Sequence, residues 1–317
     1  MKTMPLLGDT KSALENKVAL VTGAASGIGR AIALAFARAG AGIVIGDIRE
    51  RPVGEGSATA DIIRQRGGKA LFVETDVAQK SQVEALIKKT VQELGRIDIL
   101  VNNAGIGHVS SVEHTPDRVL KQLVEVNFYG AVYGAQAVLP VMRAQGSGHI
   151  INVASGAAMM GLPYASIYAA TKAAIARFSE ALRYELEDSN IHVSVIYPDF
   201  TATDLALEVT PDANRRTRTV RSLNRQGVEK YGPPAAKLQS PEGVAQAVLA
   251  CALHPRSDVY LSPRIRFHGL FRTLFPAAVE REARRVKRSI AEFLAKISKD
   301  DRKTPEAPIS ENCGVAD

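Results

Sequence analysis

The sequence predicts an α/β protein with a doubly wound, mostly seven-stranded parallel sheet, helices on both of its faces and a C-terminal helical extension. Two observations predict this class. Short apolar runs alternate with longer amphipathic segments from residue 18 to residue 261, which is typical of right-handed βαβ units. The first run also ends in a glycine-rich turn that opens a helix. Seven strands in about 245 residues favour one domain over two.

Each element follows from its own pattern. Strands are expected where aliphatic residues run unbroken, and helices where apolar residues recur every three or four positions. The predicted strands are 18–22, 43–47, 70–74, 97–101, 148–153, 191–197 and 258–261. The predicted helices are 28–39, 54–66, 79–94, 117–143, 165–187 and 241–253.

The remaining segments lie outside this alternation. Residues 1–16 are expected to form a loose leader before a Rossmann-like domain over 17–262, and 263–302 a basic helical extension before a flexible tail at 303–317. Residues 200–235 are irregular and contain several prolines and glycines. A loop of that length in a compact domain is usually functional, so we expect a lid there.

Composition excludes several classes of protein. Apolar residues make up 46% and charged residues 23%, as in soluble globular proteins. The chain has no apolar run of membrane-spanning length and no signal-like start, so we expect a cytoplasmic protein. The two cysteines, Cys251 and Cys313, suit a reducing compartment. No histidines have metal-ligand spacing, so no metal is expected.

The net charge of +7 is concentrated near the C-terminus, where residues 264–303 carry twelve Lys or Arg and five Asp or Glu. The simplest interpretation is a solvated helix face. One alternative is peripheral contact with an anionic membrane, and another is packing on a partner subunit or closure of the active site. No nucleic-acid recognition motif is present, so nucleic acid is not expected. In the membrane contact and in the subunit or active-site contact alike, the apolar side chains involved would be Phe267, Leu270, Phe271, Leu274 and Phe275.

The turn after the first predicted strand has the composition of a phosphate-binding loop. It reads Thr-Gly-Ala-Ala-Ser-Gly-Ile-Gly over 22–29. Glycine lets the backbone approach a pyrophosphate, and the helix that follows presents free N–H groups and its positive dipole end. The predicted cofactor-binding residues of this loop are Gly23, Ser26, Gly27, Ile28 and Gly29.

Acidic residues at two later strand ends extend the predicted cofactor site. Asp47 can accept hydrogen bonds from the adenosine ribose and would repel a 2′-phosphate, which favours NAD. Arg30 and Arg49 lie near enough to pair with a 2′-phosphate, so NADP is the alternative. Asp76 and Val77 are expected near the adenine, although Asp76 could equally be the N-cap of the next helix.

A second group of residues suits proton transfer to a ketone oxygen, which needs an acid within hydrogen-bond reach. Tyr168 and Lys172 are four residues apart on a predicted helix and share a face. A nearby ammonium lowers the pKa of a phenol from about 10, so we expect Lys172 to lower that of Tyr168. Ser155 follows a strand at the sheet edge where ligands bind, and can hold the substrate oxygen.

Together these motifs resemble the short-chain dehydrogenase/reductase family over about residues 17–261. The matching features are the glycine loop, Asn102-Asn103-Ala104-Gly105, Asn127, Ser155 and Tyr168-Ala-Ala-Thr-Lys172. The resemblance implies a single Rossmann-like domain, a nicotinamide cofactor, a small-molecule substrate and a homodimer or homotetramer. It also implies that Lys172 holds the nicotinamide ribose and that Asn127 links Lys172 to solvent through water.

The family pattern also places residues at the nicotinamide end. The family often has Pro-Gly before a cofactor-contacting Thr, whereas this chain has Asp199 after the proline, so Asp199 is a candidate for the pocket lining. The cofactor-binding residues that the resemblance implies are Asn103, Ala104, Gly105, Tyr168, Lys172, Pro198, Thr201 and Thr203.

The resulting prediction is an NAD(H)-dependent oxidoreductase that interconverts a secondary alcohol and a ketone, with Tyr168 as general acid–base. Met159, Met160 and Leu162 lie before Tyr168 and favour a hydrophobic or aromatic substrate. One alternative is an NADPH-dependent carbonyl reductase. The other is a non-catalytic nucleotide-binding scaffold, which the intact Tyr–Lys pair disfavours.

Overall fold

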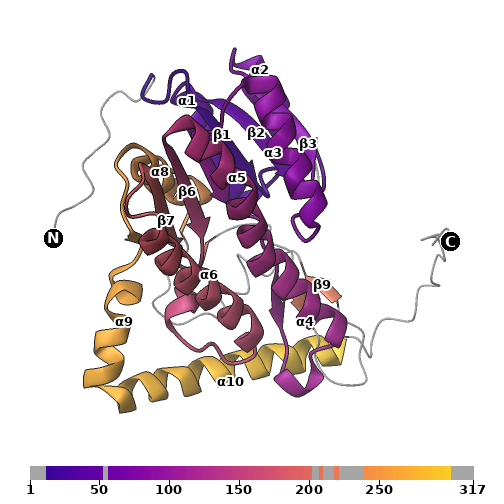
Figure 1. Cartoon of the computed structure of the whole chain (residues 1–317). Coiled ribbons are helices and arrows are strands. Elements are labelled where there is room, and N and C mark those ends of the chain that lie inside the picture. The colour runs from indigo at the N-terminus through magenta and orange to yellow at the C-terminus, as the bar shows by residue number, and fades with distance from the viewer. Residues whose placement is uncertain (1–11, 53–55, 202–206, 210–217, 221–238, 301–317) are drawn as a thin grey trace.

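The computed structural model describes residues 12–52, 56–201, 207–209, 218–220 and 239–300 (Figure 1). Seven parallel strands form one sheet in the order β10-β7-β6-β4-β1-β2-β3. The strand order reverses between β1 and β4, which in open α/β sheets marks the ligand-binding edge. The strands are β1 (Val18–Thr22), β2 (Gly42–Asp47), β3 (Ala70–Glu74), β4 (Ile99–Asn102), β6 (Gly148–Val153), β7 (Ile191–Tyr197) and β10 (Asp258–Tyr260).

Helices cover both faces of this sheet because alternate strand residues point to opposite sides. Val21 and Ile45 pack with α1 and α8, whereas Leu20 and Val44 pack with α3, α5 and α6. The helices of this domain are α1 (Gly27–Arg38), α2 (Thr59–Gln65), α3 (Lys80–Leu94), α4 (Asp117–Val124), α5 (Gly130–Gln145), α6 (Ser166–Glu185) and α8 (Pro241–Leu253), with the short η1 (Val112–His114) and η3 (Gly156–Met159). The predicted doubly wound, seven-stranded parallel fold is therefore confirmed.

One predicted helix needs correction. The segment expected as a single helix over 117–143 consists of α4 and α5 joined by a π-helical turn, η2 (Glu125–Tyr129). A π turn holds more residues than an α turn and is frequent at functional sites. Asn127 lies inside this turn and is 1% exposed. The helix expected from residue 54 also begins later, at Thr59.

A small second sheet lies beside the first and was not predicted. It consists of β5 (Gly107–Val109), β8 (Leu207–Val209) and β9 (Arg218–Val220), in which β5 pairs with β8 in parallel and β8 with β9 antiparallel. Strands of three residues are too short to show a period of two. Strands β8 and β9 belong to the predicted lid at 200–235, most of which lies outside the described residues.

Both ends of the described chain contact the domain. Leu14 is buried, and its N–H donates to the carbonyl oxygen of Ala39 at 2.8 Å. At the other end, α9 (Pro263–Leu274) and α10 (Pro276–Asp300) follow the last strand and lie below the sheet in Figure 1. Residues 1–11 of the predicted leader and the predicted tail at 303–317 lie outside the described residues. Within the described ranges, no helix carries an apolar stretch long enough to cross a membrane.

Candidate cofactor-binding and catalytic site

The glycine loop between β1 and α1 has a backbone that side chains would obstruct. Gly23 and Gly27 have φ angles of +64° and +55°, in the left-handed region that favours glycine. At Gly29, a Cβ would lie 2.2 Å from the carbonyl oxygen of Gly23. Ser26 is the N-cap of α1 and Ile28 lies in its first turn. The loop therefore forms an open backbone cradle at a helix N-terminus, which fits a pyrophosphate.

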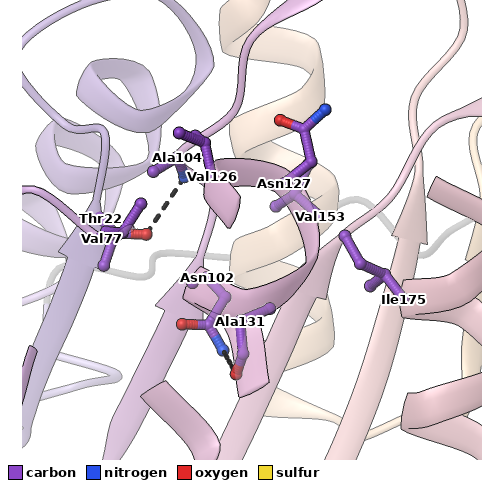
Figure 2. Close-up of a pocket in the computed structure, with 10 residues that line it drawn as sticks. Thr22, Val77, Asn102, Ala104, Val126, Asn127, Ala131, Val153 and Ile175 are labelled. Carbon is purple, nitrogen blue, oxygen red and sulfur yellow. Dashed lines mark hydrogen bonds between the residues drawn. The ribbon is translucent and has the colours of Figure 1, made fainter. Parts of the chain in front are cut away.

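Thr22 and Asn103 fix this loop to the end of β4. The Thr22 Oγ1 accepts hydrogen bonds from the N–H of Asn103 at 3.0 Å and from the N–H of Ala104 at 3.1 Å. Figure 2 shows the bond to Ala104. The Asn103 side chain donates to the carbonyl oxygens of Thr22 and Gly23. Sequence reasoning gave Thr22 no role, although its position directly before the glycines was a usable signal. Asn103 and Ala104 thus lie beside the loop, and their contact with the cofactor stays a prediction.

Asp47 lies at the tip of β2 and faces the same loop. Its Oδ2 accepts the N–H of Ala25 at 2.9 Å, and its Oδ1 accepts the N–H of Arg49 at 3.3 Å. Burial raises the pKa of Asp47, and these backbone hydrogen bonds oppose that rise. The Arg30 guanidinium donates to the carbonyl oxygen of Ser57. A carboxylate at this position fits the ribose hydroxyls of a dinucleotide.

Asp76 and Val77 follow β3 at the same edge. The Asp76 carboxylate accepts the N–H of Ala78 at 3.0 Å, and its own N–H donates to Gln82. These contacts are those of a turn that precedes α3. The N-cap of α3 is Gln79, so the alternative interpretation of Asp76 as that N-cap is wrong. Val77 is buried, and a Cβ at Gly130 would lie 3.0 Å from its Cβ.

A small enclosed cavity lies between the glycine loop and the catalytic residues (Figure 2). It has room for about one water molecule. The lining residues are Thr22, Val77, Asn102, Ala104, Val126, Asn127, Gly130, Ala131, Val153 and Ile175.

Tyr168 and Lys172 lie one turn apart on α6, as predicted. Lys172 is 5% exposed, and its Nζ donates to the carbonyl oxygen of Val153 at 3.0 Å. The same Nζ lies 6.0 Å from the centroid of the Tyr168 ring. Burial lowers the pKa of Lys172 to about 8, because a desolvated ammonium loses its hydration.

The expected lowering of the Tyr168 pKa is not observed. Burial raises this pKa, and hydrogen bonding with the Ser155 side chain only partly opposes the rise. The physical reason is that desolvation disfavours the phenolate, while the Lys172 ammonium donates to a backbone carbonyl oxygen. Ser155, and not Lys172, is therefore the side chain that acts to lower the Tyr168 pKa.

Ser155 and Asn127 complete this cluster. Ser155 follows β6, and its Oγ accepts the N–H of Ala157 at 3.1 Å. The Asn127 side chain both accepts from and donates to the backbone of Ile106, and it donates to Thr171. A Cβ at Gly105 would lie 3.2 Å from the Asn127 Oδ1 and 3.3 Å from the Lys172 Nζ. The fold thus gathers Gly105, Asn127, Tyr168 and Lys172, with Ser155 facing Tyr168.

The residues predicted at the nicotinamide end are less closely gathered. The Pro198 carbonyl oxygen accepts the N–H of Gly156 at 2.7 Å. The Thr201 hydroxyl donates to the carbonyl oxygen of Asp199, and the Asp199 carboxylate accepts the N–H of Phe200. Thr203 lies outside the described residues. The Asp199 N–H also donates to the Gln239 side chain at 3.0 Å, so this segment is tied to the start of α8.

A phosphate-binding loop beside a Tyr–Lys pair defines a class, the dinucleotide-dependent oxidoreductases. The family model for short chain dehydrogenase matches residues 17–214, and the chain belongs to this family. The predicted resemblance is thereby confirmed. The family uses NAD or NADP, which confirms the predicted nicotinamide cofactor at the level of the family.

Individual relatives span several activities. The chain is 34% identical to a 3-oxoacyl-[acyl-carrier-protein] reductase of Synechocystis over 77% of this chain and 92% of that protein. It is 34% identical to a cis-4-hydroxycyclohexanecarboxylate dehydrogenase of Sinomonas cyclohexanicum over 78% of this chain and 93% of that protein. A glycine betaine reductase of Emericella nidulans is 32% identical over 80% of this chain, which spans 19% of that protein's length.

The solved structures agree with the fold. A short-chain dehydrogenase/reductase from Burkholderia phymatum, determined in complex with NAD, has a TM-score of 0.71 and 28% identity to this chain. The alignment covers 83% of this chain and 96% of that structure. The match extends beyond the glycine loop to most of the described domain.

Proposed function

We propose that the protein is an NAD(H)-dependent oxidoreductase that interconverts a secondary alcohol and a ketone, with Tyr168 as general acid–base. The observation that carries this proposal is the buried Lys172 beside Tyr168, at the edge where the glycine loop also lies. A buried lysine with a lowered pKa is typical of a functional site. The relatives named as a reductase and a dehydrogenase support the same chemistry.

The residues divide the reaction between them. The glycine loop and Lys172 would hold a nicotinamide dinucleotide, which would supply the capacity to give a hydride to the carbonyl carbon or to accept one from the alcohol. Tyr168 donates the proton that the new alcohol oxygen requires, and takes it back in the reverse direction. Ser155 holds the substrate oxygen against the Tyr168 hydroxyl. The Ser155 hydrogen bond, which opposes the rise in the Tyr168 pKa, stabilises the phenolate that remains after Tyr168 has donated its proton, and Lys172 would hold the nicotinamide ribose.

Asn127 serves this site as a positioning residue. Its side chain fixes the backbone of Ile106, next to Gly105, and contacts Thr171, next to Lys172. It therefore keeps the β4 loop at a fixed distance from α6. The water-mediated proton relay through Asn127 stays a prediction.

Asp47 supports the choice of NAD over NADP. A 2′-phosphate beside this half-buried carboxylate would bring two negative charges together. Arg30 donates to the carbonyl oxygen of Ser57, whereas the Asp47 carboxylate accepts the N–H of Ala25 in the loop. We therefore propose NAD(H) as the cofactor.

The substrate end of the site is apolar. Met159, Met160 and Leu162 are half-buried in the segment between Ser155 and Tyr168. Methionine adapts to irregular apolar shapes, which suits a hydrophobic or aromatic substrate. The cyclohexane ring in the name of one relative's substrate is compatible with this class.

The test of the cofactor assignment is calorimetric titration with NADH and with NADPH. We expect wild-type protein to bind NADH more tightly. In Asp47→Ala, the affinity ratio should move toward NADPH by about tenfold, because the repelling carboxylate is gone. Asp61→Ala is the control, since Asp61 is an exposed carboxylate on α2 paired with Arg64. An unchanged ratio in Asp47→Ala would refute the role of Asp47, and failure to bind either nucleotide would refute the proposal.

A further inference from the structure

Helix α9 is attached to the domain through one side chain. Ile265 is fully buried and packs with Ala154, Val195 and Tyr197. Its Cδ1 lies so close to Gly156 that a Cβ there would be 2.6 Å away. All the other residues from Pro263 to Leu274 are exposed or only half-buried. The helix is therefore anchored at its first turn and presents the rest of its surface outward.

The outward surface of α9 is apolar along one stripe. Among the described residues, ten large hydrophobic side chains are exposed, and five of these lie between 267 and 275. At about 100° per residue, positions 267, 270, 271 and 274 span an arc of roughly 100°, whose centre lies almost opposite Ile265. The members of this α9 stripe are Phe267, Leu270, Phe271, Leu274 and the adjoining Phe275, which are 48% to 60% exposed.

Cations border the stripe on both sides. Arg264 lies about 20° from one edge of the stripe and Arg266 about 40° from the other, whereas His268 and Arg272 lie farther round the helix, toward the side of Ile265. Burial, and then the charges of Arg264 and Arg272, lower the pKa of His268, so the positive charge around the stripe is carried by the arginines. No Asp or Glu occurs between Asp258 and Glu280.

We propose that the α9 stripe docks the protein on an anionic membrane surface. The Phe and Leu side chains would enter the boundary between headgroups and acyl chains, and the flanking arginines would pair with lipid phosphates. A helix of 12 residues reaches only about 18 Å and so lies on a bilayer rather than crossing it. This inference concerns α9 alone and is independent of the proposed reaction.

Charge favours a lipid surface over a second copy of this chain. In a symmetric contact between two α9 stripes, the arginines of one subunit would face the same arginines of the other, and like charges would repel. The border without a single carboxylate offers those arginines no partner. An anionic leaflet supplies the missing negative charge and the apolar layer together.

Co-sedimentation of the full chain with vesicles tests this proposal. We expect binding to phosphatidylcholine vesicles that contain phosphatidylglycerol, weaker binding to pure phosphatidylcholine, and loss of binding at about 0.5 M salt. The triple variant Arg264→Gln/Arg266→Gln/Arg272→Gln should weaken binding about a hundredfold, or roughly fivefold per arginine. The variant Leu270→Ser/Phe271→Ser/Leu274→Ser should weaken binding at least about tenfold per side chain.

Matched variants separate docking from general charge and general hydrophobicity. Arg38→Gln/Arg66→Gln/Arg143→Gln removes three exposed arginines elsewhere, and Tyr184→Ser removes a side chain that is 70% exposed on α6. Both should bind vesicles as the wild type does. All variants retain Ile265, and thermal unfolding checks that they fold. No binding to anionic vesicles, or an equal loss in the control variants, would overturn the proposal. A stripe variant that changes the oligomeric state without any vesicle binding would assign the stripe to a protein contact instead.

Discussion

The glycine loop and the catalytic cluster share one edge of the sheet but are held there by different forces. Hydrogen bonds to backbone groups, made by the side chains of Thr22, Asn103 and Asp47, fix the loop together with the absence of side chains. The catalytic cluster is built from ionisable groups, Tyr168 and Lys172, whose pKa values burial shifts against their charged forms. The loop should therefore be sensitive to side-chain size, and the cluster to charge and proton transfer.

The largest effect is expected from Tyr168→Phe, which keeps the ring and removes the proton donor. The value of kcat/KM should fall about 10³-fold or more, because a positioned acid contributes that much to proton transfer. Steady-state kinetics measure this loss, and calorimetry should show unchanged NADH affinity. Tyr184→Phe on the same helix is the control, because Tyr184 is 70% exposed. If Tyr168→Phe keeps more than a tenth of the activity, Tyr168 is not the acid.

The second effect concerns size in the loop. Gly29→Ala places a methyl group 2.2 Å from the Gly23 carbonyl oxygen and 2.4 Å from the Asn103 Nδ2. The displaced backbone should weaken NADH binding about a hundredfold. Gly161→Ala is the matched control, since a Cβ there meets nothing within 4 Å. Calorimetry that shows equal affinities for both variants would contradict the cradle described here.

The smallest effect concerns stability. Lys172→Met should raise the free energy of unfolding at pH 7 by about 2 kcal/mol, even though it abolishes activity. Burial lowers the pKa of the Lys172 ammonium from 10.5 to about 8, so keeping it charged at pH 7 destabilises the folded chain. The uncharged thioether of Met carries no such penalty. The lost bond to Val153 offsets part of the gain. Lys89→Met on the exposed face of α3 should change stability little.

The pH dependence sharpens this prediction. The unfolded chain holds the Lys172 proton up to about pH 10.5, whereas the folded chain releases it near pH 8. Between these values the unfolded state binds more protons, so this lysine makes stability rise with pH. Denaturant unfolding of wild type and Lys172→Met across this range should show a converging difference. A constant difference would mean that the Lys172 pKa is not lowered.

Much of the fold could be predicted because local patterns specify it. Unbroken aliphatic runs predicted all seven strands of the main sheet to within two residues at either end. The glycine loop could also be predicted from the sequence. Its backbone requires glycine at fixed positions, so the spacing of the glycines reveals it. The site could be assembled because parallel strands end at one edge.

The remainder depends on contacts between distant residues. The Val153 carbonyl that binds Lys172 is a backbone group, so no sequence motif marks it. The raised pKa of Tyr168 results from burial in the folded chain, and the spacing of Tyr168 and Lys172 in the sequence does not predict how deeply they are buried. The pairing of β5 with β8 joins segments about a hundred positions apart. Each of these features exists only once the tertiary structure has formed.

The π-helical turn at Glu125–Tyr129 has a consequence for chain length. An extra residue in a helix rotates everything after it by about 100° about the axis. In an uninterrupted α-helix Leu123 and Ala135 would lie about 120° apart, but the wide turn takes up one residue, so both face the protein interior. A chain shortened by one residue here would form a regular α-helix with both side chains still on one face. The deletion should therefore preserve the packing of α4 and α5 and displace Asn127, which lies inside the turn.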